Sequence, residues 1–120
     1  MKILKTLTRV YTNTLDETLR FYEDITGTHA GIRFAMPAIG LELAQVQNIL
    51  IIAGTDESLR PFRSTSATFL VDSIEEYYRF LTGHGATVIR PPQQVPTGMN
   101  MTVRHPEGTV IEYVEYRKNT

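Results

Sequence analysis

Two stretches of the sequence decide the fold: LDETLRFYEDITG at residues 15–27 and IEEYYRFLTGHG at residues 74–85. When the second stretch is laid over the first at a constant offset of 59 residues, a Glu, an Arg and a Phe recur at matching places. Self-similarity at a fixed spacing is the signature of a chain built from repeated units. The sequence therefore predicts two copies of one structural unit.

Each copy begins with the pattern of a helix amino terminus. Thr14 is followed three residues later by Glu17, and Ser73 is followed in the same way by Glu76. Both pairs match a capping box, in which the hydroxyl accepts a hydrogen bond from a first-turn N–H and the Glu reaches back to the cap. Apolar residues then recur at helical spacing, and glycines follow them, so we expect one amphipathic helix in each copy.

Strand-like runs rich in Thr, Val, Tyr and Phe lie before and after each helix. The expected strands are residues 7–12, 31–35, 41–46 and 49–53 in the first copy and 66–71, 87–90, 99–104 and 109–116 in the second. Each copy is therefore a βαβββ unit. The polar residues 54–64 are expected to form an exposed connector, and the proline-rich residues 91–98 a loop.

A unit of about 55 residues buries too little apolar surface to be stable alone, so we expect the two to share one domain. We predict a single α+β domain over residues 1–120, with modules at about 1–56 and 64–120. The two βαβββ modules would form a curved mixed sheet around a central cavity, with the helices outside. A concave face of this kind is a common place for a small ligand.

The composition limits the classes of function. The chain carries 12 Lys and Arg against 13 Asp and Glu, has 42% hydrophobic residues and contains no Cys. Without a basic stripe, a long apolar run or a secretory signal, we expect neither nucleic acid nor a membrane as a partner. The lack of Cys excludes disulfides and thiolate metal sites and fits a cytoplasmic location.

The paired units, the two helix stretches and the closing HPEGTVIEYVE at residues 105–115 resemble the vicinal oxygen chelate superfamily. That superfamily includes glyoxalase I, extradiol dioxygenases and bleomycin-resistance proteins, and the closing stretch is similar to its usual Asp-Pro-x-Gly-Asn-x-Ile-Glu. The resemblance covers nearly the whole chain and implies the glyoxalase-like fold. It leaves the activity open, because this scaffold carries isomerases, dioxygenases, transferases and binding proteins.

The family's enzymes usually hold a divalent metal with side chains from four strands. At the positions that the resemblance assigns to these ligands, this sequence has Leu7, Ser66, one of the apolar residues 51–53, and Glu112. A divalent ion needs roughly three good oxygen or nitrogen donors besides water. Only Glu112 is such a donor, so we expect no metal site and no other cofactor.

Alternation along the strands indicates which side chains share the inner face, because residues two apart point to the same side. The predicted ligand-binding residues are Leu7, Arg9, Tyr11, Ile51, Ser66, Thr68, Met101 and Glu112. Arg9 offers a planar fork for a carboxylate or a phosphate-like group, or it forms an ion pair with Glu112. Glu112 is also the candidate for catalysis, as an acid or base, and otherwise a hydrogen-bonded relic of the metal site. Tyr11 and Met101 are equally compatible with packing.

Three functions remain open on this evidence. The preferred interpretation is a metal-free small-molecule binding protein of the glyoxalase and bleomycin-resistance type, which encloses an organic ligand in the cavity between the sheets. The alternatives are a lyase, isomerase or dioxygenase of the glyoxalase superfamily, and a non-catalytic accessory domain whose cavity is filled by its own side chains. The resemblance also implies a homodimer, and exposed edge strands give a physical reason for one.

Overall fold

The computed structural model describes residues 1–117, which fall into two compact units. The first unit is Thr8–Ser64, and the second combines Met1–Leu7 with the described residues from Thr65 onward. The first strand, β1 (Ile3–Thr12), therefore begins in the second unit and ends in the first.

The first unit contains one βαβββ repeat. After β1 come α1 (Leu15–Thr26), β2 (Ile32–Met36), the 3-10 helix η1 (Pro37–Ile39), β3 (Leu41–Val46), β4 (Ile49–Ala53) and the short helix α2 (Asp56–Leu59). The strands lie in the order β2-β3-β4-β1. β1 runs parallel to β4, and the other neighbouring pairs are antiparallel.

The second unit contains the other repeat. Its elements are β5 (Thr65–Val71), α3 (Ile74–Thr82), β6 (Thr87–Val95), β7 (Gly98–Arg104) and β8 (Val110–Tyr116). The strands lie in the order β5-β8-β7-β6, with β5 parallel to β8 and the other pairs antiparallel. This order and these directions repeat those of the first unit, so the α+β class and the two βαβββ units expected from the sequence are confirmed.

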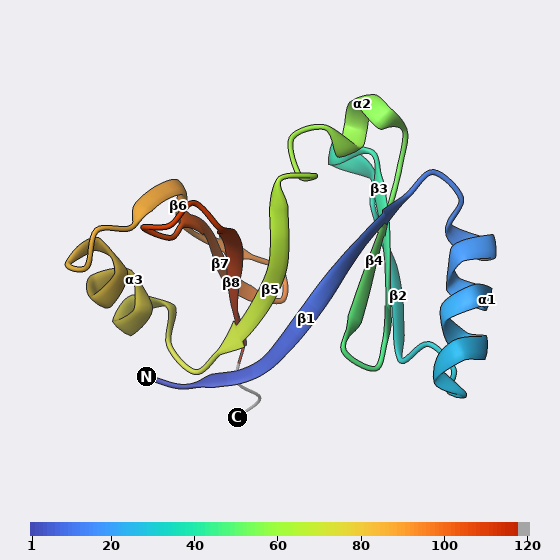
Figure 1. The fold of residues 1–120 in the computed structure, drawn as a ribbon, viewed down its shortest axis with the longest axis horizontal. Coiled ribbons are helices and arrows are strands. Elements are labelled where there is room, and N and C mark those ends of the chain that lie inside the picture. Colours follow the sequence, from blue (N-terminus) through green and yellow to red (C-terminus); the bar gives the residue numbers. More distant parts are fainter. Residues whose placement is uncertain (118–120) are drawn as a thin grey trace. The chain divides into compact units, whose positions relative to one another are not determined.

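In the first unit, α1 lies beside the sheet (Figure 1) and packs its apolar side on one face of it. Leu15 and Leu19, one helical turn apart, are buried together with Val46 of β3 and Ile51 of β4. Pairing of β1 with β4 sets Val10 beside Ile51 on this face, so side chains at the neighbouring positions of β1 point to the opposite face. The helix ends at Gly27, whose left-handed backbone (φ 70°) suits glycine.

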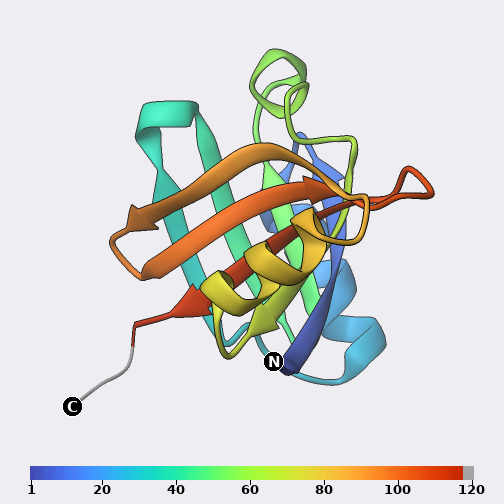
Figure 2. The same cartoon turned by 90° about the vertical axis from the view of Figure 1, so that its left-hand side faces the viewer.

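In the second unit, α3 lies across the sheet (Figure 2) and buries Ile74, Tyr77 and Leu81 against it. Met101 of β7 and Tyr113 of β8 complete this core. Because successive side chains on a strand alternate, the burial of Tyr113 under α3 directs the preceding residue of β8 to the opposite face. That residue is Glu112.

The helix amino termini differ from each other. At α3 the expected cap is present, since the Ser73 hydroxyl accepts a hydrogen bond from the Glu76 N–H at 3.2 Å. At α1 the prediction of a side-chain cap is wrong, because the Thr14 side chain makes no capping hydrogen bond to the helix. The Thr12 hydroxyl takes its place in the turn by accepting a hydrogen bond from the Thr14 N–H at 3.1 Å, a local competition that is typical of Thr.

Two expected loops also contain regular structure. The segment predicted as a proline-rich loop is mostly strand, because β6 continues to Val95 and pairs Gln93 with Asn100 of β7. β6 ends the strand order, where prolines without an N–H are tolerated. The connector after β4 forms α2, and its Leu59 is fully buried.

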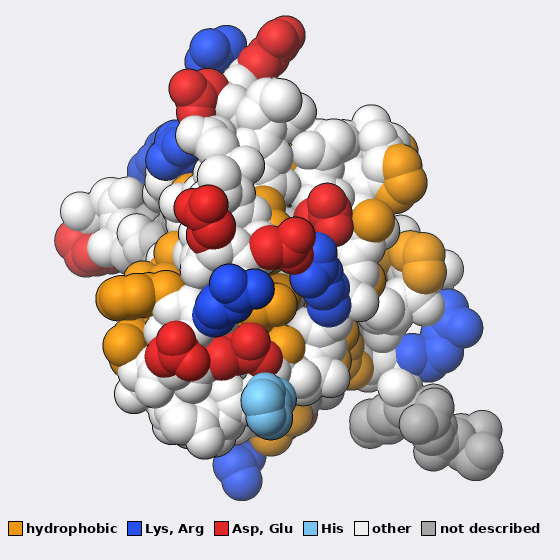
Figure 3. Space-filling view, turned by 90° about the vertical axis from the view of Figure 1, so that its right-hand side faces the viewer, with side chains coloured by type: hydrophobic (Ala, Val, Ile, Leu, Met, Phe, Trp, Pro, Cys, Tyr) orange, Lys and Arg blue, Asp and Glu red, His pale blue; other side chains and the backbone are white. Residues whose placement is uncertain are grey.

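The charged side chains of the face shown in Figure 3 are mixed in sign. Among the ion pairs of the first unit, Arg33 Nη2 lies 2.8 Å from Asp16 Oδ1 and 3.8 Å from Glu42 Oε2. Within residues 1–117, no helix is both long and apolar enough to span a membrane.

Candidate functional site

Glu112 lies in the middle of β8, on the sheet face opposite α3. Thr68 of β5 and Thr102 of β7 are its direct neighbours across the two adjoining strands. The Thr68 hydroxyl donates a hydrogen bond to Glu112 Oε1 at 3.1 Å, and both threonines are buried. Hydrogen bonds to an ionised acceptor are roughly twice as strong as neutral ones. The strand pairing therefore places the Thr68 hydroxyl where it donates to the Glu112 carboxylate on this face.

The same line of side chains continues to the end of the sheet, because Arg90 of β6 is paired with Thr102. We call Thr68, Glu112, Thr102 and Arg90 the polar row; each comes from a different strand. Tyr116 follows Glu112 by four residues on β8 and so lies on the same face. Its pKa is raised, first by burial and then by the negative charge of Glu112.

A second group of polar side chains lies in the first unit. Arg9 Nη1 donates a hydrogen bond to the Tyr11 hydroxyl at 3.0 Å, and that hydroxyl donates to the backbone carbonyl of Phe62. The guanidinium carbon of Arg63 lies 5.9 Å from the centre of the Tyr11 ring, within the range of a cation–π contact. We call these four residues the arginine–tyrosine cluster.

The other predicted ligand-binding residues lie apart from these two groups. Leu7 is buried, and Ser66 is exposed where the pairing of β5 with β8 is irregular. Ile51 packs in the core under α1, and Met101 packs in the core under α3. The structure thus brings Thr68 and Glu112 together, and Arg9 and Tyr11 together, while Ile51 and Met101 lie on the helix faces of their sheets.

The donor atoms at the positions that the family resemblance assigns to metal ligands do not fit a divalent ion. Leu7 and residues 51–53 carry apolar side chains, and Ser66 offers only a hydroxyl. Glu112 is left as a single carboxylate, whereas such ions need several oxygen or nitrogen ligands. Within residues 1–117, no three His, Cys, Asp or Glu side chains gather as a metal-binding group.

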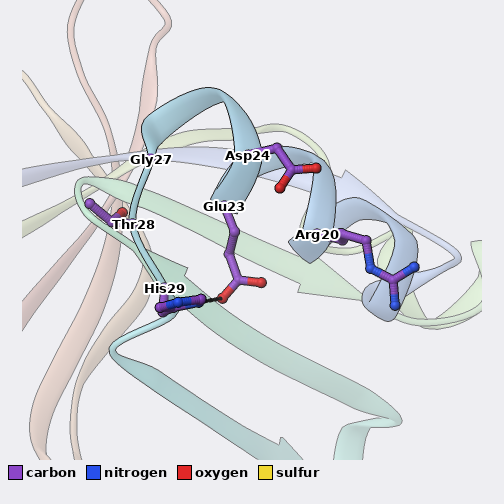
Figure 4. Close-up of a pocket in the computed structure, with 6 residues that line it drawn as sticks. All are labelled: Arg20, Glu23, Asp24, Gly27, Thr28 and His29. Atoms are coloured by element: carbon purple, nitrogen blue, oxygen red, sulfur yellow. Dashed lines mark ion pairs between the residues drawn. The ribbon is translucent and has the colours of Figure 1, made fainter.

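A surface pocket at the carboxyl end of α1 holds none of the predicted site residues (Figure 4). Its lining residues are Arg20, Glu23, Asp24, Gly27, Thr28 and His29. Glu23 and His29 point toward each other, with 3.5 Å between Glu23 Oε2 and His29 Nδ1. The same carboxylate accepts a hydrogen bond from the Ala30 N–H at 2.8 Å, so Glu23 fastens the loop after α1 to the helix.

Several residues of the two groups are absent from the sequence prediction. Thr102 belongs to the polar row, and alternation in MNMTVR at residues 99–104 carries the signal for it, since Met101 faces the helix. Arg90 was expected at the end of a strand that in fact continues. Phe62 and Arg63 lie in the connector, where no periodic pattern indicates which side chains turn toward β1.

Taken together, the two βαβββ repeats, the second of which ends in a strand that carries Glu112, define a glyoxalase-like fold. The sequence model of the Glyoxalase/Bleomycin resistance protein/Dioxygenase superfamily matches residues 3–113, and the chain belongs to this superfamily. The resemblance to the vicinal oxygen chelate proteins is thereby confirmed. No curated protein matches the chain at a significant level.

Solved structures show the same fold. A hypothetical protein from Methanosarcina mazei is 53% identical, with a TM-score of 0.93 over 100% of this chain and 98% of that one. The methylmalonyl-CoA epimerase of Mycobacterium tuberculosis is 18% identical, with a TM-score of 0.73 over 97% of this chain and 90% of that one. A variant of the Streptomyces coelicolor methylmalonyl-CoA epimerase, in complex with 2-nitronate-propionyl-CoA, is 14% identical, with a TM-score of 0.74 over 98% and 100%. At these identities, the epimerases share the fold alone with this chain.

Proposed function

We propose that this protein binds a small organic molecule without a metal ion and uses the sheet face that carries Glu112. The observation that supports this most directly is the polar row, in which four adjoining strands place a carboxylate, two hydroxyls and a guanidinium in register. Ligand sites typically combine apolar walls with a few placed polar groups. The polar row supplies hydrogen bonds and charge, which do not require a metal.

The chemistry of this face indicates the kind of ligand. The Glu112 carboxylate accepts hydrogen bonds, so it suits an N–H or O–H group of the ligand. Val114 lies two residues further on β8 and therefore on the same face, where it offers apolar surface. We expect a molecule with an apolar body and a hydrogen-bond donor.

A second candidate function is metal-independent proton transfer by Glu112, as in an isomerase or lyase. Two observations favour it: the Thr68 hydroxyl orients the Glu112 carboxylate, and solved epimerases that act on methylmalonyl-CoA share the fold. A positioned carboxylate is a suitable general base. In this case the ligand would be a substrate with an acidic C–H beside a carbonyl, such as an acyl thioester.

A thermal-shift screen of small aromatic compounds, carboxylates and acyl thioesters tests both candidates. For a compound that raises the melting temperature, we expect Glu112→Gln to fold normally and to bind at least about tenfold more weakly, because a charge-assisted hydrogen bond is lost. Glu57→Gln, which changes an exposed carboxylate of α2, is the matched control and should bind like the wild type. Equal affinity in the Glu112 variant would contradict the proposed site.

Two further readouts separate the functions. Turnover of a screened compound by the wild type, with loss of turnover in Glu112→Gln, would replace the binding function by the catalytic one. A metal ion that binds the native state would raise the melting temperature. Because we propose that no metal is bound, addition of Zn, Ni, Mn or Fe should leave the melting temperature unchanged. A rise of several degrees would remove the metal-free proposal.

We also propose that the protein forms a homodimer in the cytoplasm. β2 ends the strand order and exposes Ile32, Phe34 and Met36, which alternate along the strand and so share one face. End strands with exposed apolar side chains favour pairing with another chain, and the absence of Cys fits a reducing compartment. Light scattering after size exclusion should give the mass of a dimer, and Phe34→Lys should reduce it to that of a monomer. A monomeric wild type would contradict the proposal.

A further inference from the structure

We propose that a surface hollow at one end of the first unit binds a small primary ammonium compound with an apolar body. The hollow has a volume of about 370 Å³ and lies among the last residues of β2 and β4, the first residues of β3 and the start of α1. We call it the Glu42 hollow, after the carboxylate that lines it. Its residues all belong to Thr8–Ser64, and the inference does not require ligand binding at the polar row.

Glu42 occupies a position on β3 where an apolar side chain would be expected. Ala44 and Val46 follow it at two-residue steps and are fully buried in the core under α1, so Glu42 lies on the same face of the sheet. Its neighbours on the adjoining strands are Ala35 of β2 and Ala53 of β4. Because an alanine on each side fills little space, this row leaves a hollow beside the carboxylate.

Apolar side chains form part of the wall of the Glu42 hollow. Leu15 and Ala53, which belong to the core under α1, line it together with Ala35 and Pro37. Pockets that hold small ligands have volumes of roughly 300–1,000 Å³, and the Glu42 hollow lies near the lower end of this range. We therefore expect a small ligand whose body is a short hydrocarbon chain.

Two polar side chains of the hollow offer hydrogen-bond acceptors. One is the Glu42 carboxylate, and the other belongs to Asn13. Asn13 Nδ2 donates to the Gly54 carbonyl at 2.8 Å and to Asp56 Oδ1 at 3.0 Å. These bonds use the N–H groups of the amide, so Asn13 offers its Oδ1 to a ligand. Two acceptors of this kind suit a primary ammonium, which is a compact group of N–H donors.

The charges around Glu42 favour a cation. Arg33 Nη2 lies 2.8 Å from Asp16 Oδ1 but 3.8 Å from Glu42 Oε2, which exceeds the roughly 2.7–2.9 Å of a charge-assisted hydrogen bond. Arg33 therefore keeps its closer partner, Asp16, when a ligand ammonium approaches Glu42. Two carboxylates against one guanidinium leave a negative charge at this place, and Glu17 adds another in the first turn of α1. The same charges disfavour an anion.

The backbone that lines the hollow is held in place. The Gly54 N–H donates to the Thr12 carbonyl at 3.1 Å, and the Gly54 carbonyl accepts the hydrogen bond from Asn13. A Cβ on Gly54 would lie 2.9 Å from the Gly40 carbonyl oxygen, so these two glycines of the lining are packed backbone to backbone. A lining that is fixed in advance reduces the entropy that ligand binding must overcome.

The test is a titration of isotope-labelled protein with butylammonium chloride, followed by nuclear magnetic resonance. Separate arms use sodium butyrate, which carries a similar apolar chain with the opposite charge, and sodium chloride at the same ionic strength. The readout is the chemical shift of the backbone amides of Ala35, Glu42 and Ala53. We expect saturable shifts in the butylammonium arm alone. Shifts that butyrate or sodium chloride reproduces would overturn the proposal.

The same titration separates the Glu42 hollow from the polar row. Thr68 and Thr102 are the direct neighbours of Glu112 across the adjoining strands, so an amine that binds there shifts their amides. Shifts confined to these two amides would overturn the proposal for the Glu42 hollow and leave the proposed function standing. Saturable shifts at Glu42 support the hollow even if no compound binds at Glu112.

A charge variant tests the role of the carboxylate. Glu42→Gln should weaken the affinity for butylammonium at least about tenfold, because the charge-assisted hydrogen bond to the ligand is lost. Glu57→Gln, which changes an exposed carboxylate of α2 outside the lining, is the matched control and should change the affinity less than about twofold. Equal losses in the two variants would indicate general charge attraction and overturn the site.

A filling variant tests the hollow itself without a change of charge. Ala35 is exposed and is paired with Glu42, so Ala35→Leu fills the hollow from the β2 side and should weaken the affinity several-fold. Ala38→Leu makes the same change at an exposed residue of η1 that does not line the hollow, and it should bind like the wild type. Circular dichroism checks that each variant is folded. Wild-type affinity in folded Ala35→Leu would overturn the proposal, and if that variant fails to fold, Glu42→Gln decides.

Discussion

Replacement of Tyr113 by Phe should change how the stability of the protein depends on alkaline pH. Tyr113 is 2% exposed, its hydroxyl lies 2.6 Å from His105 Nε2, and its ring packs edge-on against Phe69. Burial, followed by the nearby Tyr77, raises the pKa of Tyr113 to about 12 from its ordinary value of 10. This side chain also anchors β8 in the core, which directs Glu112 to the opposite face.

The sign of the effect follows from proton linkage. Because the pKa of Tyr113 is higher in the folded state than in the unfolded chain, the folded state holds the phenol proton more tightly. The stability linked to this proton is fully present below about pH 10 and is lost as the pH rises through the folded pKa. A difference between 10 and about 12 corresponds to roughly 2.7 kcal/mol at 1.36 kcal/mol for each pH unit.

Near neutral pH, Tyr113→Phe should lower the free energy of unfolding by about 1 kcal/mol, because the hydrogen bond to His105 is lost. Between pH 9 and 12 the wild type should lose roughly 2–3 kcal/mol more of its free energy of unfolding than the variant does. The difference in stability between the two proteins therefore becomes smaller as the pH rises, and at the highest pH the variant is the more stable one. Urea unfolding, followed by circular dichroism across this range at constant ionic strength, measures both curves. Tyr78→Phe, which removes an exposed phenol of α3, is the matched control and should follow the wild type. Parallel curves for the wild type and Tyr113→Phe would refute the reasoning.

Four other substitutions test the packing and the hydrogen bonding that support the site. Leu59→Ala should lower the free energy of unfolding by about 2–5 kcal/mol, since this side chain is fully buried; a loss below about 1 kcal/mol would show that α2 is not anchored by it. Gly98→Ala should destabilise the protein by several kcal/mol, because the added Cβ would lie 2.0 Å from a backbone carbonyl oxygen of β8. In Gly27→Ala the added Cβ meets no atom within 4 Å, so this variant should lose only about 1–2 kcal/mol through its backbone conformation. Equal losses in the two variants would contradict the close contact at Gly98. Thr68→Val should lower the stability by about 1–2 kcal/mol through the lost hydrogen bond to Glu112, and a neutral result would show that this bond does not hold the carboxylate. Urea unfolding curves measure the free energy of unfolding of all four variants.

Much of the fold could be predicted from the sequence because its signals are local and repeated. The strands at Leu41–Val46 and Ile49–Ala53 have the predicted bounds, and both helices begin where a Thr or Ser precedes an apolar pattern. The constant offset between the copies then fixed the topology, since one unit predicts the other. The extension of β6 through its prolines could not be foreseen, because their tolerance depends on the strand being last in its sheet.

The candidate site could be predicted only in part. Alternation placed Thr68 and Glu112 on one face, and their side chains are joined by a hydrogen bond. It also placed Arg9 and Tyr11 on one face, and these side chains are hydrogen-bonded as well. Alternation tells which side chains share a face, but it does not tell which face the helix covers, and Ile51 and Met101 lie under the helices. The approach of the connector to Tyr11 depends on tertiary packing, which carries no periodic signal.

The most direct test of metal-free binding is the affinity of the protein for the best compound of the ligand screen, measured by calorimetry after exhaustive treatment with a chelator. If the ligand is held by the polar row without a metal, the dissociation constant is the same in treated and untreated protein. The metal content of the untreated protein should then lie far below one ion per chain. Binding that disappears with the chelator and returns on addition of Zn, Ni, Mn or Fe would contradict this account.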